Sequence, residues 1–70
     1  MNRLPVSSSN IVSIGYDSNS MILEVEFKNS VYRYYGIPEY IYTELMSAES
    51  HGKYLDANIK KAGYDYERIE

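Results

Sequence analysis

The run from Met21 to Lys28 alternates between two sets of side chains, and this alternation constrains the fold more than any other feature. One set is wholly apolar and consists of Met21, Leu23, Val25 and Phe27. The other set is mostly charged and consists of Ile22, Glu24, Glu26 and Lys28. A period of two is typical of an antiparallel strand with one face against a core. The run therefore predicts a half-buried strand.

Two shorter runs flank this strand. Upstream, Val12, Ile14 and Tyr16 alternate with small residues, and the following segment 17–20, Asp-Ser-Asn-Ser, is rich in turn formers. Downstream, Asn29-Ser30 precedes the segment 31–35, Val-Tyr-Arg-Tyr-Tyr, at a spacing that fits a two-residue hairpin. The sequence thus predicts a three-stranded antiparallel meander.

The turn lengths predict a register for the meander. The second hairpin is expected to pair Lys28 with Val31, Phe27 with Tyr32, Glu26 with Arg33, and Val25 with Tyr34. The first is expected to pair Tyr16 with Met21, Ile14 with Leu23, and Val12 with Val25. Opposed residues share a face, so both hairpins predict one core face. The other face is expected to carry Ile11, Ser13, Ile22, Glu24, Glu26, Arg33 and Tyr35.

Two helices are expected after the meander. Pro38 and Glu39 are typical of a first turn, and Ile41, Leu45 and Ala48 recur at helical spacing. Ser50 suits the N-cap of a second helix whose apolar side carries Leu55, Ile59 and Ala62, ahead of Gly63. The alternating tail 64–69 is expected to add a fourth strand or to lie as an extended arm. The predicted class is α+β, a single domain over 1–70 in which two helices pack on the three-stranded meander, with an extended C-terminal segment.

Composition narrows the functional classes. The chain has seven Lys and Arg residues and ten Asp and Glu residues, and this acidic balance argues against a general binder of polyanions. There is no cysteine, and no apolar stretch long enough to cross a bilayer, so we expect a cytoplasmic protein. A domain of 70 residues buries only about 60% of its unfolded surface and has little room for a deep pocket. Nine tyrosines, with an apolar ring and a polar tip each, suit binding better than chemistry.

A succession of short motifs resembles the KTSC domain family, over residues from about Ser9 to Ile69. The motifs are Ser9 with Ile11, Ile14-Gly15-Tyr16-Asp17, Leu23-x-Val25-x-Phe27, Tyr32-x-Tyr34, Ile37-Pro38, and Ala48-x-Ser50-x-Gly52-x-Tyr54 with Ile59. The resemblance implies a stand-alone bacterial or phage domain, or one like the C-terminal domain of some lysyl-tRNA synthetases. It implies no established activity, and RNA binding only by that association. Two departures are Ser30, where members often have Gly, and Leu55-Asp56, where they often have Phe-Asn.

Two groups of residues are candidates for binding. The first is Arg33 with Tyr35, on the predicted outer face, where a ring and a cation suit a base and a phosphate. The second is the start of the second helix, where Ser50, Gly52, Lys53 and Tyr54 suit an anion. Each group also has a plainer interpretation. In the first, Tyr32 and Tyr34 are core residues and Arg33 pairs with Glu26 on the neighbouring strand. In the second, the residues form an ordinary capped helix with Glu49–Lys53 and Asp56–Lys60 pairs.

No motif predicts catalysis. The only histidine, His51, has no accompanying nucleophile, phosphate loop or second metal ligand, so we expect no catalytic residue, metal or cofactor. The preferred function is a homo-oligomer that sequesters a nucleotide-like anion in a pocket between subunits, with Ile11, Ile22, Val31 and Tyr35 in the interface. A protein-interaction module and, less favoured, an RNA-binding domain are the alternatives. No membrane partner is expected.

Overall fold

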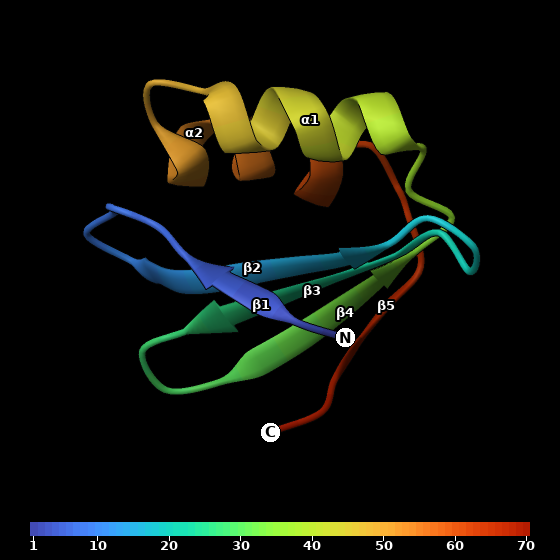
Figure 1. Cartoon of the computed structure of the whole chain (residues 1–70), viewed down its shortest axis with the longest axis horizontal. Coiled ribbons are helices and arrows are strands. Elements are labelled where there is room, and N and C mark those ends of the chain that lie inside the picture. The colour runs from blue at the N-terminus through green and yellow to red at the C-terminus, as the bar shows by residue number, and fades with distance from the viewer.

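The computed structural model describes all 70 residues and consists of one antiparallel sheet with a layer of helices on one face (Figure 1). Five strands lie in chain order across the sheet: β1 (Arg3–Pro5), β2 (Ile11–Asp17), β3 (Ile22–Phe27), β4 (Val31–Tyr35) and β5 (Tyr66–Arg68). The helical layer contains α1 (Glu39–Ser47), α2 (His51–Leu55) and a π-helical turn, η1 (Asp56–Lys60). The α+β class and the two-helix cover are confirmed.

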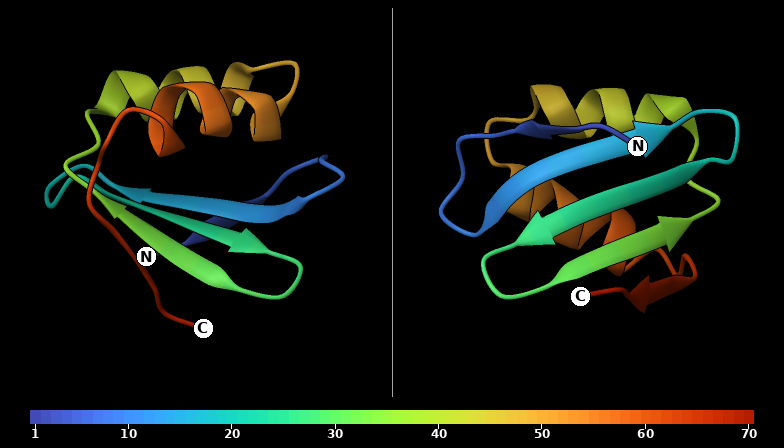
Figure 2. Two further views of the ribbon diagram at one scale, coloured as in Figure 1. Left: turned by 180° about the vertical axis from the view of Figure 1, so that it is seen from behind. Right: turned by 60° about the horizontal axis from the view of Figure 1, so that its bottom comes forward.

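The predicted number of strands is too small. The meander β2–β3–β4 was predicted, but β1 and β5 extend it at its two edges, as the view of the sheet in Figure 2 shows. The C-terminal segment is thus a strand, and it pairs Tyr34 with Tyr66. A strand was one of the two outcomes expected for this segment, whereas β1 was not predicted. β1 has only three residues, too few to establish an alternating pattern, and ends at Pro5, a residue that sheets tolerate at an edge.

Both hairpins differ in register from the prediction by two residues. In the first, Ile14 lies opposite Val25, not Leu23; in the second, Val25 lies opposite Tyr32, not Tyr34. The loops account for this difference. The first begins one residue later than predicted, and the last pair of the second hairpin is Glu26 with Val31, so that Phe27 pairs only with β2. A shift of two residues leaves each side chain on its original face. Most of the core face was therefore predicted correctly despite the wrong pairs.

The prediction of the core face is wrong at the start of β2, where the strand contains a β-bulge. Ile11 lies opposite Phe27 and Ser13 opposite Glu26, so Val12 is an extra residue on β2. Ile11 consequently joins the core at 1% exposure, whereas Val12 is 41% exposed. The prediction had placed Val12 in the core and Ile11 on the outer face. Met21 was also predicted to be buried, but it is 40% exposed and takes a positive φ of 57° in the β2–β3 loop.

The helices cover the core face through residues at helical spacing. Ile41 and Leu45 of α1, Leu55 of α2 and Ile59 of η1 are buried against the sheet. Ser50 caps α2 as predicted, since its hydroxyl accepts a hydrogen bond from Lys53 N at 3.2 Å. Pro38 is the N-cap of α1, not its first helical residue, and Ala48 and Ala62 lie beyond the helices. No helix combines the length and apolar character that crossing a membrane requires.

Candidate functional site

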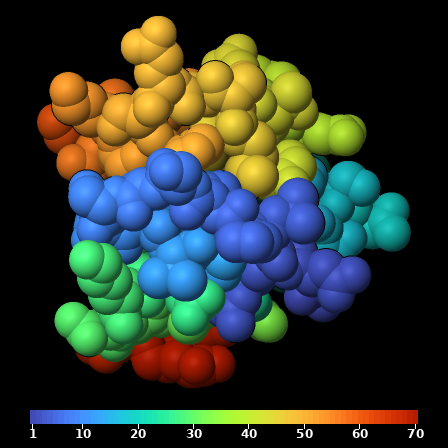
Figure 3. Space-filling model, turned by 60° about the vertical axis from the view of Figure 1, so that its left-hand side comes forward, coloured from blue at the N-terminus to red at the C-terminus, as the bar shows by residue number.

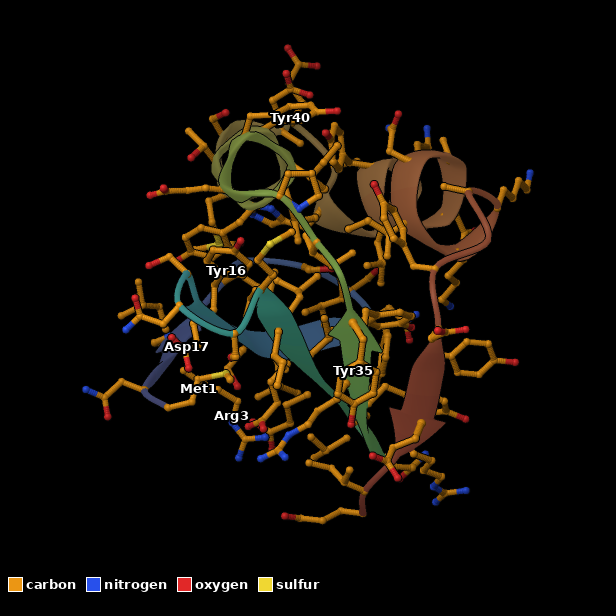
Figure 4. The ribbon with its side chains drawn as sticks, turned by 90° about the vertical axis from the view of Figure 1, so that its right-hand side faces the viewer. Met1, Arg3, Tyr16, Asp17, Tyr35 and Tyr40 are labelled. Carbon is orange, nitrogen blue, oxygen red and sulfur yellow. The ribbon has the colours of Figure 1, made fainter.

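The two predicted groups of binding residues lie on opposite faces of the sheet. Arg33 and Tyr35 are on β4 with their side chains on the outer face, away from the helices. Figure 4 shows Tyr35 there, on the same side of the sheet as Arg3. Ser50, Gly52, Lys53 and Tyr54 belong to the start of the second helix, on the other face. The structure therefore does not bring the six residues into one site within a chain.

Arg33 and Tyr35 are occupied by neighbours. Arg33 Nε donates a hydrogen bond to Glu24 Oε1 at 2.9 Å, and this hydrogen bond to Glu24 raises the pKa of the guanidinium. The predicted partner, Glu26, instead accepts a hydrogen bond from the Ser13 hydroxyl. The Tyr35 hydroxyl donates to Glu67, which raises the pKa of Tyr35. This part of the outer face pairs its own charges, so it offers no free cation to a ligand.

The outer face also lacks the apolar surface that was expected for an interface between subunits. Ile11 is in the core because of the bulge, and Val31 is buried at 4% exposure. Glu24, a charged residue, is buried at the centre of this face, where Arg3 Nη1 lies 3.2 Å from its Oε2. The four proposed interface residues therefore do not form one exposed apolar patch.

The larger of two neighbouring hollows lies at the β4–β5 end of the sheet, between the core face and the helical layer. We call it the tyrosine groove; its volume is about 550 Å³, and its aromatic wall consists of Phe27, Tyr32, Tyr34, Tyr64 and Tyr66. The remaining lining residues are polar or cationic: Asn10, Lys28, Asn29, Ser30 and Lys60. Figure 3 shows the connections that meet on this side of the molecule, with the β1–β2 connection (blue) between the β3–β4 turn (green) and α2–η1 (orange).

Four of the five rings of the groove, those of Phe27, Tyr32, Tyr34 and Tyr66, form a connected cluster. Tyr66 lies 6.2 Å from Tyr32 and 6.0 Å from Tyr34, measured between ring centroids, and Tyr32 meets the edge of Phe27 at 5.9 Å. Tyr34 is the buried base of the cluster at 3% exposure, and burial raises its pKa to about 12. Tyr66 is 65% exposed. The groove thus offers accessible aromatic surface above a fixed, buried ring.

Lys60 contributes a cation to this aromatic wall. Its Nζ lies 5.1 Å from the centroid of the Phe27 ring, within the range of a cation–π contact. The same atom lies 3.5 Å from Asp56 Oδ1, which confirms the predicted Asp56–Lys60 pair. The other predicted pair is absent, because Lys53 has no carboxylate within 4.0 Å. Lys60 is the last residue of η1, and π-helical turns often occur at functional sites.

A second hollow adjoins the groove. We call it the polar hollow; its volume is about 330 Å³, and its lining consists of Ser9, Asn10, Phe27, Ser50, Gly52, Lys53, Leu55, Asp56 and Lys60. Three predicted residues, Ser50, Gly52 and Lys53, therefore line a hollow. Tyr54 does not line it; the Tyr54 hydroxyl donates to Glu44 Oε1 at 2.6 Å, and burial together with this bond raises the pKa of Tyr54 to about 12.

Sequence reasoning missed the tyrosine groove. Tyr32 and Tyr34 were assigned to the core, which is correct for Tyr34, but Tyr32 is only half-buried. The available signal was the second Tyr-x-Tyr pair, Tyr64 and Tyr66, which returns to β4 through β5. No group of three or more His, Cys, Asp or Glu side chains is arranged to hold a metal ion.

Comparisons with known proteins agree with this architecture. The KTSC domain model matches residues 7–66. An uncharacterised protein of Stutzerimonas stutzeri (strain A1501) is 38% identical over 71 residues, with all of both chains covered. A protein of Tsukamurella paurometabola is 37% identical over 57 residues, which cover 80% of this chain and 85% of that one.

The fold itself recurs in a solved structure. The crystal structure of a KTSC domain protein from Yersinia pestis matches with a TM-score of 0.92 and 41% identity, over 99% of this chain and 97% of that chain. Neither the family description nor the relatives' descriptions state an activity. The family match, the relatives and the shared fold lead to one conclusion: this chain belongs to the KTSC domain family.

Proposed function

We propose that this KTSC domain protein is a non-enzymatic binding protein whose tyrosine groove takes a small anionic ligand that carries a flat ring, such as a nucleotide. The observation behind the proposal is the juxtaposition of five aromatic side chains with Lys28 and Lys60 in one hollow. A volume of about 550 Å³ falls within the range typical of small-molecule sites, about 300–1,000 Å³.

The aromatic wall supports the ring part of the proposal. Stacking of a base on an aromatic side chain contributes about 1–3 kcal/mol and tolerates any base. Tyr66 and Tyr32 are accessible enough to stack, whereas Tyr34 supports them from below. A ligand with one flat ring would therefore gain most of its binding energy from this wall.

The charges of the groove support the anionic part. The protein has a net charge of −3, yet the groove's lining contains two lysines and no carboxylate. Lys28 is exposed and forms no ion pair, so its ammonium group is free to meet a phosphate. The acidic balance elsewhere disfavours long polyanions, which weakens the RNA-binding alternative.

A second subunit is not needed for this site, because one chain already carries the groove. The homo-oligomer therefore stays a prediction that is separate from ligand binding. Native mass spectrometry of protein purified gently from cells tests both points at once. A retained mass of nucleotide size supports the binding proposal, and the mass of the assembly gives the number of subunits.

Calorimetric titration tests the proposal directly. We expect AMP to bind more tightly than either adenosine or inorganic phosphate, because only AMP presents both a ring and an anion. Tyr66→Ala should weaken AMP binding by about tenfold, the loss of one stacking contact. Tyr40→Ala is the matched control, since Tyr40 is 62% exposed, close to the 65% of Tyr66, and lies on α1 on the far side from the sheet (Figure 4).

Lysine variants provide a second matched pair. Lys28→Ala should weaken AMP but not adenosine, whereas Lys61→Ala, an exposed lysine outside both hollows, should change neither. Equal binding of AMP by wild type, Tyr66→Ala and Lys28→Ala would refute the proposed site. Failure of any mononucleotide to bind would refute the proposed function and favour a protein-interaction module.

A further inference from the structure

The tyrosine groove and the polar hollow are neighbouring hollows that share part of their walls. Three residues line both: Asn10, Phe27 and Lys60. The volumes of the two hollows are about 550 and about 330 Å³. A mononucleotide whose ring stacks on the tyrosines would leave the polar hollow unfilled.

The two hollows differ in chemistry. Five of the ten lining residues of the groove are aromatic, whereas the polar hollow has only Phe27 and Leu55 as apolar residues. The rest of the polar hollow supplies hydroxyl, amide and ammonium groups, from Ser9, Asn10, Ser50 and Lys53 among others. Such groups suit a sugar and a phosphate, which offer many hydrogen-bonding oxygens but no large apolar surface.

Lys60 belongs to the wall that the two hollows share. Its side chain is 44% exposed, so its ammonium group is accessible to a ligand while it lies over Phe27. Asp56 pairs with Lys60 and is the only carboxylate in either lining. The linings together carry Lys28, Lys53 and Lys60 against Asp56, which leaves a surplus of two positive charges along the two hollows.

We infer that the ligand is a dinucleotide, two nucleoside units joined through a bridging phosphate. One base stacks in the tyrosine groove, the bridging phosphate lies beside Lys60, and the sugar and terminal phosphate of the second unit occupy the polar hollow near Lys53. This inference rests on the proposed function and specifies its ligand. The two can fail separately, because a mononucleotide tests the groove alone.

The test compares AMP with the 5′-phosphorylated dinucleotide pApA and with a decamer of adenylate, by calorimetric titration of the full chain. We expect pApA to bind at least about tenfold more tightly than AMP, since it adds contacts in the polar hollow. Lys53→Ala should weaken pApA several-fold and leave AMP unchanged. Lys61→Ala, which removes an exposed lysine outside both linings, is the matched control and should change neither.

Each other outcome overturns the inference. Equal affinities of AMP and pApA would leave the proposed function intact but show that one nucleotide completes the ligand. Tighter binding of pApA without an effect of Lys53→Ala would show that the second unit lies elsewhere. A decamer that binds far more tightly than pApA would mean that the two hollows are a stretch of an RNA path. Failure of AMP and pApA alike would remove the proposed function as well.

Discussion

Arg3 on β1 reaches over β2 to the carboxylate of Glu24 on β3, with 3.2 Å between Arg3 Nη1 and Glu24 Oε2. The residue that lies between them is Gly15, which is opposite Arg3 on one side and Glu24 on the other. Because Gly15 has no side chain, the arginine stem can cross the strand directly above it. Glu24 also accepts the hydrogen bond from Arg33 on β4, so one buried carboxylate joins three strands of the sheet.

Gly15→Ala should therefore destabilise the protein by about 1–3 kcal/mol, the usual cost of overpacking. An added Cβ would lie 2.8 Å from the backbone oxygen of Asn2 and 3.0 Å from Arg3 Cγ, so β1 would have to move. Urea unfolding measures the loss. Gly52→Ala is the matched control, because nothing lies within 4 Å of its added Cβ, and it should be neutral or slightly stabilising. Equal stability of the two variants would contradict this account of β1.

Glu24→Gln should cost about 1–3 kcal/mol, because it removes the charge that two arginines share. Glu24 is 7% exposed, but the side chains of Arg3 and Arg33 are 28% and 39% exposed, so water recovers part of their solvation. Chemical unfolding again supplies the measurement. Glu49→Gln changes an exposed glutamate without an ion pair and should stay within about 0.5 kcal/mol of wild type. A Glu24→Gln protein as stable as this control would mean that the ion pairs of Glu24 with Arg3 and Arg33 do not stabilise the fold.

The bulge in β2 predicts opposite outcomes for neighbouring residues. Ile11→Ala should cost about 2–5 kcal/mol, because Ile11 is buried in the core at 1% exposure. Val12→Ala should change the free energy of unfolding by no more than about 0.5 kcal/mol, because Val12 is 41% exposed. The same unfolding measurement on both variants checks the register. A larger loss for Val12→Ala would mean that β2 has no bulge and that the simpler alternation holds.

The free energy of unfolding should fall in strongly alkaline solution because of Tyr34. Burial raises its pKa from 10.0 to about 12, so the folded protein favours the neutral phenol. The stability that depends on this phenol is fully present below pH 10 and is lost as the pH rises through about 12. Tyr34→Phe removes the titrating group, so its unfolding free energy should decline less between those pH values. Identical declines for the two proteins would exclude Tyr34 as the cause.

The register of the meander was within reach of sequence reasoning only up to a shift of two residues. The alternation in β3 and β4 determines which side chains share a face, because that property depends on the period alone. The alternation gives no information on which of two registers with the same faces is adopted. Loop conformation decides between them. In the first loop Met21 takes a φ of 57°, and in the second Phe27 N donates a hydrogen bond of 2.8 Å to Ser30 O. Neither loop has the bounds that its turn-forming residues predicted.

The candidate site was less accessible to such reasoning. Ser50, Gly52 and Lys53 were identified from local helix chemistry, and they line a hollow. Arg33 and Tyr35 were chosen as exposed residues, but their hydrogen bonds to Glu24 and Glu67 join residues 9 and 32 positions apart. The sequence predicted that Arg33 pairs with a glutamate of the preceding strand, but the two-residue shift in register makes that partner Glu24 and not Glu26. The contact of Tyr35 with Glu67 was not predicted, because it depends on the pairing of β5 with β4.

The sequence by itself determined the strands of the meander, the two helices, their apolar faces and the family, because these depend on short-range periodicity, capping and motif order. Only the tertiary structure decided the edge strands, the bulge that buries Ile11 and exposes Val12, and the tyrosine groove. The groove brings Phe27 and Tyr32 together with Lys60 and Tyr66, which are far apart along the chain. Such contacts exist only once β5 pairs with β4 and η1 packs above them, and the free energy that holds them belongs to the whole fold and not to any one segment.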